Sequence, residues 1–293
     1  MAPLCLFASD LHGRPDRYHK LFLAIEAERP GAVVLGGDLL PNGFGVAARS
    51  TGAGTHEGGL GFVEGFLAPR LSRLRDSLTG AYPAVFVILG NDDPRAEENG
   101  VLDLEGRGLW HYAHQRRIAW NRFNIYGYSC VPPTPFRLKD WERYDVSRYV
   151  DPGCLSPEEG WRTVPVADCE VRYGTIQGDL DLLAGADDLD RAIFLFHCPP
   201  YNSALDRAAL DGQSIDHVPL DVHVGSIAIQ RFILCRSPLV TLHGHVHESA
   251  RLTGAWRTQL ARTHAFSAAH DGPELALVRF DPDRPDEAIR TLV

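Results

Sequence analysis

Residues 84–93 read AVFVILGNDD, six apolar residues followed by a glycine, an asparagine and two aspartates. An apolar run of this length, bounded by a polar turn, is typical of a strand that is buried on both of its faces. Asn91, Asp92 and Asp93 come directly after this predicted strand. The stretch therefore predicts a buried strand with polar side chains at its carboxyl end.

Further apolar runs and helical patterns surround this strand in the first third of the chain. Residues 4–9 (LCLFAS) and 32–37 (AVVLGG) predict two more strands, and residues 17–29 predict a helix because their apolar residues lie close to one helical face. Residues 62–78 also have a helical period, which we expect Pro69 to interrupt. This alternation of strands and helices predicts a parallel sheet that helices cover on both faces.

The remaining two thirds of the chain predict a second set of elements. We expect paired strands at 115–129, a helix at about 176–190, a strand at 192–197, a helix beginning near residue 225, a strand at 239–244, and late strands near 275–280 and 287–292. Residues 42–61 are rich in glycine, and much of residues 130–175 lacks a clear period, so both are expected to be inserted loop or lid segments. No repeat or linker divides the chain, which favours a single domain over residues 1–293.

Composition and charge argue against several classes of function. The chain has 38 acidic and 29 basic residues and a formal net charge of -9, so we expect no broad nucleic-acid-binding face. Its longest apolar runs are too short to cross a bilayer, and its first residues show no secretory signal. Six cysteines are scattered without a Cys-x-x-Cys pair, which is typical of reduced thiols in a cytoplasmic protein. The sequence does not indicate an oligomeric state.

Polar residues directly follow five of the predicted strands. They are Asp10 and His12, Asp38, Asn91, His197, and the pair His245 and His247. Ligands of open α/β sheets bind at the carboxyl ends of the strands, so these side chains are expected to meet at one rim. Oxygen and imidazole ligands in this number suit two divalent first-row metal ions. Two metal ions that share a bridging carboxylate can polarise a phosphoryl group and hold a hydroxide for in-line attack.

The order of these motifs resembles a known family. Asp-x-His, Gly-Asp, Gly-Asn, His and Gly-His-x-His follow one another between residues 10 and 247, as in the calcineurin-like metallophosphoesterases. The pieces FHCPPYN (196–202), DVHVGS (221–226) and GHVHES (244–249) are similar to those of a poorly characterised bacterial and archaeal branch of phosphoesterases. The resemblance implies a four-layer α/β/β/α sandwich, in which helices flank two mixed sheets and a binuclear metal centre lies at one edge.

The resemblance also implies a role for each motif residue. One metal ion would be held by Asp10, His12 and His247, the other by Asn91, His197 and His245, and Asp38 would bridge the two. The mixed nitrogen and oxygen ligands fit Mn, Fe, Zn, Co or Ni equally. His243 lies outside this set and is expected to be a core histidine or to support the ligands.

One position departs from the family pattern. The third turn of the family reads Gly-Asn-His-Asp or Gly-Asn-His-Glu, whereas this chain has Asp92 at the histidine position. The family histidine stabilises the transition state or protonates the leaving oxygen, and a carboxylate near two dications is ionised and cannot donate that proton. A proton shared between Asp92 and Asp93 is the alternative, so both aspartates are candidate catalytic residues.

The extra negative charge bears on the substrate. A phosphomonoester carries close to two charges near neutral pH and a diester carries one, so Asp92 disfavours the monoester more. The sequence therefore favours a phosphodiesterase that uses a metal-activated hydroxide on a small phosphate ester. A phosphomonoesterase and a non-catalytic metal-binding scaffold remain as alternatives.

Residues 223–226 (HVGS) have two interpretations. Gly225 and Ser226 are predicted to lie at a helix N-terminus, where free N–H groups can bind an anion. His223 or this turn would then contact the substrate. The other interpretation is that Ser226 is an ordinary N-cap of the helix.

Overall fold

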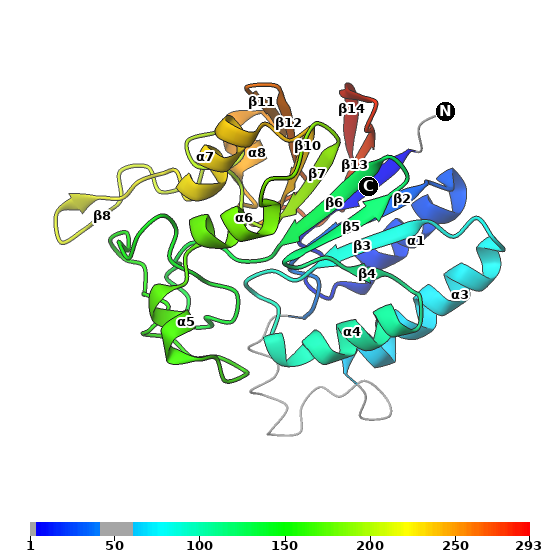
Figure 1. Ribbon diagram of the computed structural model, residues 1–293, viewed down its shortest axis with the longest axis horizontal. Coiled ribbons are helices and arrows are strands. Elements are labelled where there is room, and N and C mark those ends of the chain that lie inside the picture. The colour runs from blue at the N-terminus through cyan, green and yellow to red at the C-terminus, as the bar shows by residue number, and fades with distance from the viewer. Residues whose placement is uncertain (1–3, 42–60) are drawn as a thin grey trace.

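The computed structural model describes residues 4–41 and 61–293, which form two six-stranded sheets packed face to face with helices on both outer sides (Figure 1). Residues 42–60 of the predicted loop at 42–61 lie outside these ranges. The predicted four-layer α/β/β/α sandwich with two mixed sheets is therefore confirmed.

The first sheet has the strand order β14-β13-β1-β2-β3-β4. Its strands are β1 (Cys5–Ala8), β2 (Ala32–Gly36), β3 (Ala84–Ile88), β4 (His111–Tyr112), β13 (Ala276–Asp281) and β14 (Arg284–Leu292). β1 to β4 run parallel, whereas β13 is antiparallel to both of its neighbours. The parallel strands consequently end at the same edge of the sheet.

The second sheet has the order β11-β12-β10-β7-β6-β5. Its strands are β5 (Arg116–Trp120), β6 (Phe123–Tyr128), β7 (Ala192–Phe196), β10 (Val240–His243), β11 (Arg257–Leu260) and β12 (Thr263–Ser267). β12, β10, β7 and β6 run parallel, and β11 and β5 add antiparallel edges. β11 and β12 have no counterpart among the predicted strands.

The central strands bury both faces, as their continuous apolar runs predict. In β3, Val85 and Val87 pack in the core beneath the helices, and Phe86 and Ile88 pack in the core between the two sheets. Alternate side chains of a strand point to opposite faces, so each apolar run supplies two cores at once. β1, β2 and β7 divide their side chains between the same two cores.

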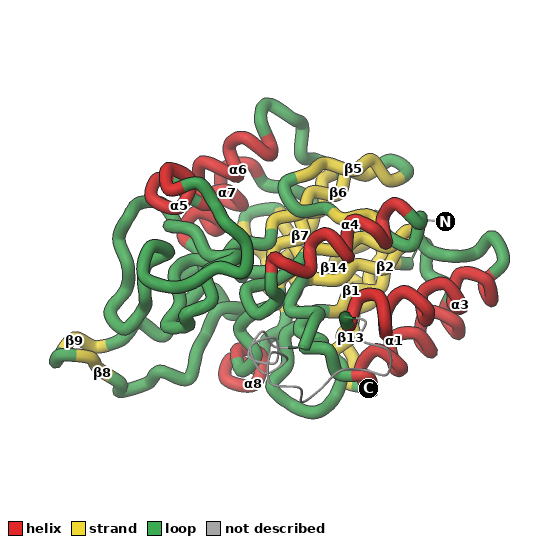
Figure 2. The backbone as a smooth tube through the Cα atoms, turned by 90° about the horizontal axis from the view of Figure 1, so that it is seen from below, coloured by secondary structure: helices red, strands yellow, loops and turns green. Residues whose placement is uncertain are grey.

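Helices cover the outer face of each sheet. The helices with side chains in the core are α1 (Pro15–Glu28), η1 (Val63–Leu67), α3 (Ala68–Leu78), α4 (Glu98–Gly106), α6 (Ile176–Ala184) and α7 (Ile227–Arg236). The short helices η2 (Arg95–Glu97), α5 (Asp168–Tyr173) and α8 (Ser249–Thr253) add no apolar side chain to it. Figure 2 shows α1 and α3 together on one side of the sheets and α6 and α7 on the other. None of these helices, within residues 4–41 and 61–293, is long and apolar enough to cross a membrane.

Pro69 does not interrupt the helix predicted at 62–78. A π-helix over Val63–Leu67 leads into α3, and Pro69 occupies the first turn of that α-helix. The helix is continuous at this point, since Leu67 and Ala68 are helical and the Ala68 N–H donates to Val63 O, so Pro69 falls just after the π-helical turn changes to α-helix. The buried residues Leu71, Leu74 and Leu78 then fix the face that α3 turns to the core.

The predicted lid segment, residues 130–175, packs against the main core through Cys130, Val131 and Trp141. Isolated bridges join Val131 to Glu142 and Leu138 to Trp161. Lys139 is fully buried and donates from Nζ to Glu142 Oε2 at 2.5 Å. The segment is therefore folded against the sandwich, although α5 is its one regular element before Ile176.

A small hairpin extends away from the sandwich on the same side as the lid. It consists of β8 (Ser214–Ile215) and β9 (Val218–Pro219), at the far left of Figure 1. The six cysteines all lie within the described ranges, and no disulfide joins any two of them.

Candidate metal centre

The predicted ligands lie at neighbouring strand ends, where parallel pairing brings them together. Asp10 and His12 follow β1, Asp38 follows β2, Asn91 follows β3, His197 follows β7, and His245 and His247 follow β10. Backbone hydrogen bonds hold adjacent turns in place, from the N–H of His12 to Asp38 O at 2.8 Å and from the N–H of Gly244 to His197 O at 2.9 Å. The centre therefore receives side chains from both sheets.

Six of these side chains form two groups whose possible ligand atoms lie within 4.8 Å of one another. The first group is Asp10, His12, Asp38 and His247, and the second is Asp38, His197 and His245. Asp38 belongs to both groups, the position that the resemblance implies for a bridging carboxylate. Asn91 adjoins the second group, with its Oδ1 3.0 Å from His197 Nε2. The seven residues are thus brought together, and their binding of metal stays a prediction.

The backbone of the centre is strained. Asp10, His12, Asp38 and His245 have positive φ angles of 57°, 49°, 52° and 72°. Residues other than glycine rarely adopt this conformation, and such strain is concentrated at functional sites. Four of the seven predicted ligands therefore occupy backbone positions that packing alone does not favour.

The charges of the centre fit bound cations. Asp10 is 1% exposed, and its Oδ2 is buried without a hydrogen-bond partner in the described part of the chain. His12 Nε2 and His247 Nε2 approach each other to 3.2 Å, and His247 Nε2 lies 3.2 Å from Asp10 Oδ1. An unpaired buried carboxylate oxygen is costly unless a cation compensates for it. The donor set therefore fits a divalent metal ion beside Asp10.

The carboxylates and imidazoles strongly perturb one another in the protein alone. Burial raises the pKa of Asp10, but the hydrogen bond and charge of His247 and the charges of His197 and His12 outweigh it and hold the pKa well below its usual range. Burial lowers the pKa of His197, but the charge and hydrogen bond of Asp38 and the charge of Asp10 raise it to about 10. The buried carboxylates thus demand positive charge, which metal ions would supply in place of protons.

Contacts behind the ligands orient them. The Nδ1–H of His197 donates to Gly36 O at 2.8 Å, which leaves Nε2 turned toward Asp38 and Asn91. A side chain at Gly90 would collide with Asp38 and with the ring of His197. Such outer contacts fix the tautomer and direction of a ligating imidazole.

Asp92 and Asp93 point in different directions. Asp93 is fully buried, and its carboxylate accepts from the N–H groups of Leu39, Leu40 and Gly90 at 3.1, 2.7 and 2.9 Å. Asp92 accepts from Asn91 Nδ2 at 3.1 Å and lies 3.8 Å from His12 Nδ1. The geometry therefore does not support a proton shared between them, because Asp93 braces the Asp38 turn and Asp92 lies beside the ligands.

Asp92 also orients the neighbouring amide. Because Asn91 Nδ2 donates to Asp92, Asn91 Oδ1 faces the second ligand group. Burial, and then the charge of Asp38, raise the pKa of Asp92 to about 6. Bound dications would favour its anion.

The predicted anion-binding turn is filled from within the protein. Ser226 caps α7 by accepting from the N–H of Ile229 at 3.0 Å. The N–H groups of Ile227 and Ala228 donate to Asp145 at 2.7 and 3.1 Å, and that of Gly225 donates to Asp206 at 3.2 Å. The serine-cap interpretation is therefore correct for Ser226. His223, by contrast, is partly exposed, with its Nδ1 2.8 Å from Asp206 Oδ1.

His243 is a core residue, one of the two expected roles. It is fully buried, and its Nδ1 donates to Cys198 O at 2.9 Å. Burial lowers its pKa to about 4, so the ring is neutral.

Sequence reasoning missed Arg17, Asp145 and Asp206. Arg17 is 5% exposed and donates to Asp10 O at 2.5 Å and to Gly272 O at 2.6 Å. An arginine on the helix predicted at 17–29, just past the Asp10 turn, was the available signal. Asp145 bonds to Ser226, 81 residues away, and Asp206 lies 17 residues before its partner His223. No local pattern reveals contacts of this separation.

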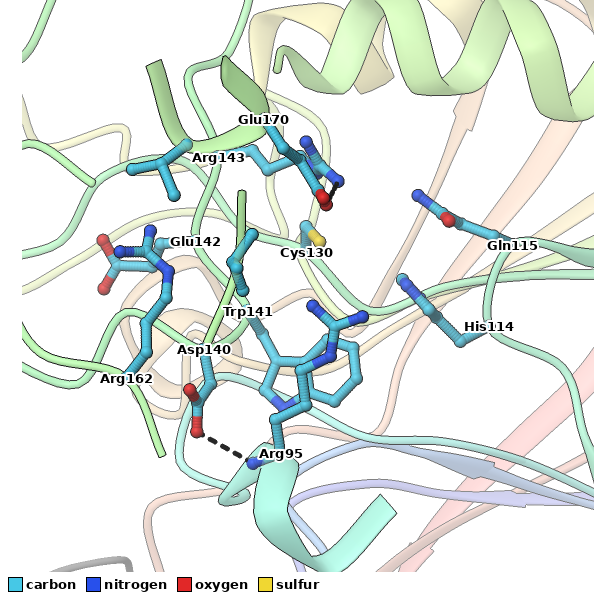
Figure 3. A pocket seen from close by; sticks show the side chains of 12 residues that line it. Arg95, His114, Gln115, Cys130, Asp140, Trp141, Glu142, Arg143, Arg162 and Glu170 are labelled. Carbon is cyan, nitrogen blue, oxygen red and sulfur yellow. Dashed lines mark hydrogen bonds and ion pairs between the residues drawn. The ribbon is translucent and has the colours of Figure 1, made fainter. Parts of the chain in front are cut away.

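A separate cavity lies behind the third turn (Figure 3). Its volume is about 40 Å³, and Arg95, His114, Trp141 and Arg143 are among its lining residues. Trp141 Nε1 donates to Asp93 O at 2.8 Å, so the lid contacts the third turn through this side chain. None of the seven predicted ligands lines the cavity.

No protein-family model and no curated protein matches the chain. Solved structures do match it. The protein TT1561 of Thermus thermophilus is 15% identical with a TM-score of 0.57, and the match covers 100% of this chain and 99% of that one. A dimetal phosphatase from Danio rerio is 15% identical with a TM-score of 0.52, covering 99% and 95%.

A third match is the phosphopantetheinyl hydrolase PptH from Mycobacterium tuberculosis. It is 11% identical with a TM-score of 0.50, and the match covers 92% of this chain and 90% of that one. Likeness at such identities establishes the fold, and two of the three matched proteins are named as phosphatase or hydrolase. The chain has the calcineurin-like metallophosphoesterase fold.

Proposed function

We propose that the protein is a hydrolase, a metal-dependent phosphoesterase with a binuclear centre. The observation that carries the proposal is the pair of ligand groups that share Asp38, next to the bare buried Oδ2 of Asp10. The fold, which a dimetal phosphatase also has, supports it. Asp10, His12 and His247 would hold one metal ion, Asn91, His197 and His245 the other, and Asp38 both.

The residues of the chain prepare the centre for phosphate chemistry. Two divalent metal ions, when bound, polarise a phosphoryl group and lower the pKa of a coordinated water. His197 is fixed by Gly36 O, and Asn91 by Asp92, so both ligands are held in direction before a metal ion arrives. This preorganisation limits the rearrangement that binding requires.

Asp92 favours diesters as substrates. Its side chain is 34% exposed and lies beside His12, so a phosphate group at the centre would meet its negative charge. A monoester dianion is repelled more strongly than a diester monoanion. We therefore propose a phosphodiesterase with weak monoesterase activity.

Two substitutions separate the charge of Asp92 from the missing proton donor. Asp92→Asn removes the charge and should raise monoester turnover relative to diester turnover. Asp92→His also supplies a donor and should raise monoester turnover further, within the roughly 10²–10⁴-fold range of general acid catalysis. Turnover of an aryl monoester and the matching aryl diester gives the ratio, and an unchanged ratio in both variants contradicts the diester preference.

Metal content decides between enzyme and scaffold. Elemental analysis after reconstitution with Mn, Fe, Zn, Co or Ni should give two metal ions per chain and identify those that support turnover. Two bound ions with no hydrolysis of any phosphate ester would instead favour a non-catalytic metal-binding protein.

A further inference from the structure

A histidine–aspartate pair lies outside the ligand cluster. His223 Nδ1 is 2.8 Å from Asp206 Oδ1, and Asp206 is fully buried. The carboxylate of Asp206 also accepts from the N–H groups of Asn202 and Ser203, both at 2.9 Å, and from that of Gly225 at 3.2 Å. Because an ionised carboxylate can only accept, Nδ1 of His223 carries a hydrogen, and Nε2 is the nitrogen that can exchange a proton.

The pair stands at the same edge of the second sheet as the metal centre. α7 connects the parallel strands β7 and β10, so its N-terminus, just past His223, lies at the carboxyl edge where His197 and His245 emerge. The ring of His223 packs edge-on against Tyr201, four residues beyond His197, with ring centroids 6.0 Å apart.

The other side of His223 leads to the second metal-ligating segment. His223 forms a β-bridge with Arg207, whose N–H donates to Ser249 Oγ at 3.1 Å. Ser249 is two residues beyond His247. His223 therefore lies between the two segments that leave the histidine-bearing strand ends.

The surroundings of His223 hold it and leave part of the ring accessible. The backbone N–H of His223 donates to Asp221 Oδ1 at 2.9 Å, and Asp221 Oδ2 accepts from the Tyr201 hydroxyl at 2.7 Å. The Tyr201 proton is thus already engaged. The side chain of His223 is 26% exposed, unlike the fully buried His243.

We infer that His223, oriented by Asp206, donates the proton to the leaving-group oxygen, the role for which the third turn has no histidine. The inference rests on the proposed phosphoesterase function. Water supplies the oxygen of the new P–O bond and loses one proton to solvent, and the bond to the leaving group breaks with its electron pair on the leaving oxygen. The proton on Nε2 passes to that oxygen, which leaves as an alcohol, and the imidazole is reprotonated from solvent.

Asp92 is a poorer candidate for this role. One of its oxygens accepts from Asn91, and the other faces His12. Both oxygens of Asp92 are therefore turned toward residues of the predicted ligand set. The ring of His223 stands apart from that cluster.

The test compares leaving groups. His223→Gln should lower turnover of a diester with an alkyl leaving group by roughly 10²–10⁴-fold and change turnover of a nitrophenyl diester far less, because nitrophenolate needs little protonation. Asp206→Asn should shift the ratio of alkyl-diester to nitrophenyl-diester turnover in the same direction. His217→Gln, an exposed histidine of the β8–β9 turn, is the matched control and should leave the ratio unchanged.

A second measurement does not depend on turnover. In the zinc-loaded wild-type protein, inorganic phosphate should shift the assigned imidazole NMR resonances of His223 and leave those of His217 in place. Equal losses for both leaving groups in His223→Gln, or no response of His223 to phosphate, overturn the assignment. Metal-loaded wild-type protein that hydrolyses no ester overturns the proposed function itself, whereas an active wild type with an unchanged ratio in His223→Gln overturns the role of His223 alone.

Discussion

Asp93 is the residue on which the geometry of the third turn most depends. Its carboxylate accepts three backbone N–H groups, two of them from the turn after Asp38. These hydrogen bonds give Asp93 a structural role. It joins the turns that present Asp38 and Asn91, so it acts on the centre through their backbones.

We expect Asp93→Ala to destabilise the protein strongly. Three buried N–H groups would lose their acceptor, and each unsatisfied group costs about 1–3 kcal/mol before the turn relaxes. Urea unfolding should show a loss of about 3 kcal/mol or more, together with weaker metal binding.

Asp103→Ala on the exposed face of α4 is the control for this change. It should stay within about 0.5 kcal/mol of the wild type, as most surface substitutions do. A loss at Asp93 no larger than that at Asp103 would show that the turn does not depend on the carboxylate.

At the scale of elements, Asp145 joins the lid to α7. Its Oδ1 accepts from the Ser226 hydroxyl at 2.6 Å, and its Oδ2 accepts from the N–H of Ile227 at 2.7 Å. A carboxylate at a helix N-terminus also interacts favourably with the helix dipole. The lid thus supplies a second acceptor, beside the Ser226 cap, for a helix whose first residue lies 82 positions further along the chain.

Asp145→Ala should destabilise both the lid segment and the first turn of α7. We expect a loss of about 1–2 kcal/mol in the free energy of unfolding, similar to the cost of removing a side chain that accepts first-turn N–H groups. Hydrogen exchange should become faster at the first-turn amides of α7 and in residues 130–165. Asp151→Ala, an exposed change in the same segment, should leave both rates as they are, and equal rates in the two variants would contradict the joining role.

The elements that the sequence predicts well are those whose signal is local. β1, β2, β3 and β7 are continuous apolar runs rather than alternating ones, so the sequence alone predicts that they are buried on both faces inside the sheets. β11 and β12 mix polar and apolar residues (RTQL and THAFS) and gain their regularity from pairing with β10 and with each other. Such strands depend on tertiary context.

The residues of the candidate site also fall into a group that local sequence predicts and a group that depends on tertiary contacts. The seven predicted ligands stand directly after strands, so their meeting at one edge follows from parallel pairing. The roles of Asp93, Asp145 and Asp206 depend on which backbone N–H groups lie nearby once the chain has folded. Their partners are up to 83 residues away, and no local spacing encodes that distance.

For the whole molecule, the metal centre should contribute to stability because its ligands come from both sheets. A ligand that binds the native state alone stabilises it by about 2.7 kcal/mol at a concentration 100 times its Kd. We therefore expect chelation to lower the melting temperature and added metal to restore it.

Asp38→Asn tests whether this effect arises at the proposed centre. The variant removes the carboxylate that both ligand groups share, so its melting temperature should respond little to chelator or metal. A wild-type melting temperature that does not change on chelation would show that metal does not stabilise the protein. An equal change in the variant would show that metal acts at another site.

The position of β13 beside β1 sets an order for biosynthesis. β1 is made first, yet one of its neighbours in the sheet is β13, which begins at Ala276. Until that strand leaves the ribosome, one edge of β1 has no partner, and the last predicted ligand, His247, is made after β1, β2, β3 and β7. The nascent chain therefore carries an open strand edge until β13 has been made, and the predicted ligand set is complete only with His247, which follows Asp10 by 237 residues.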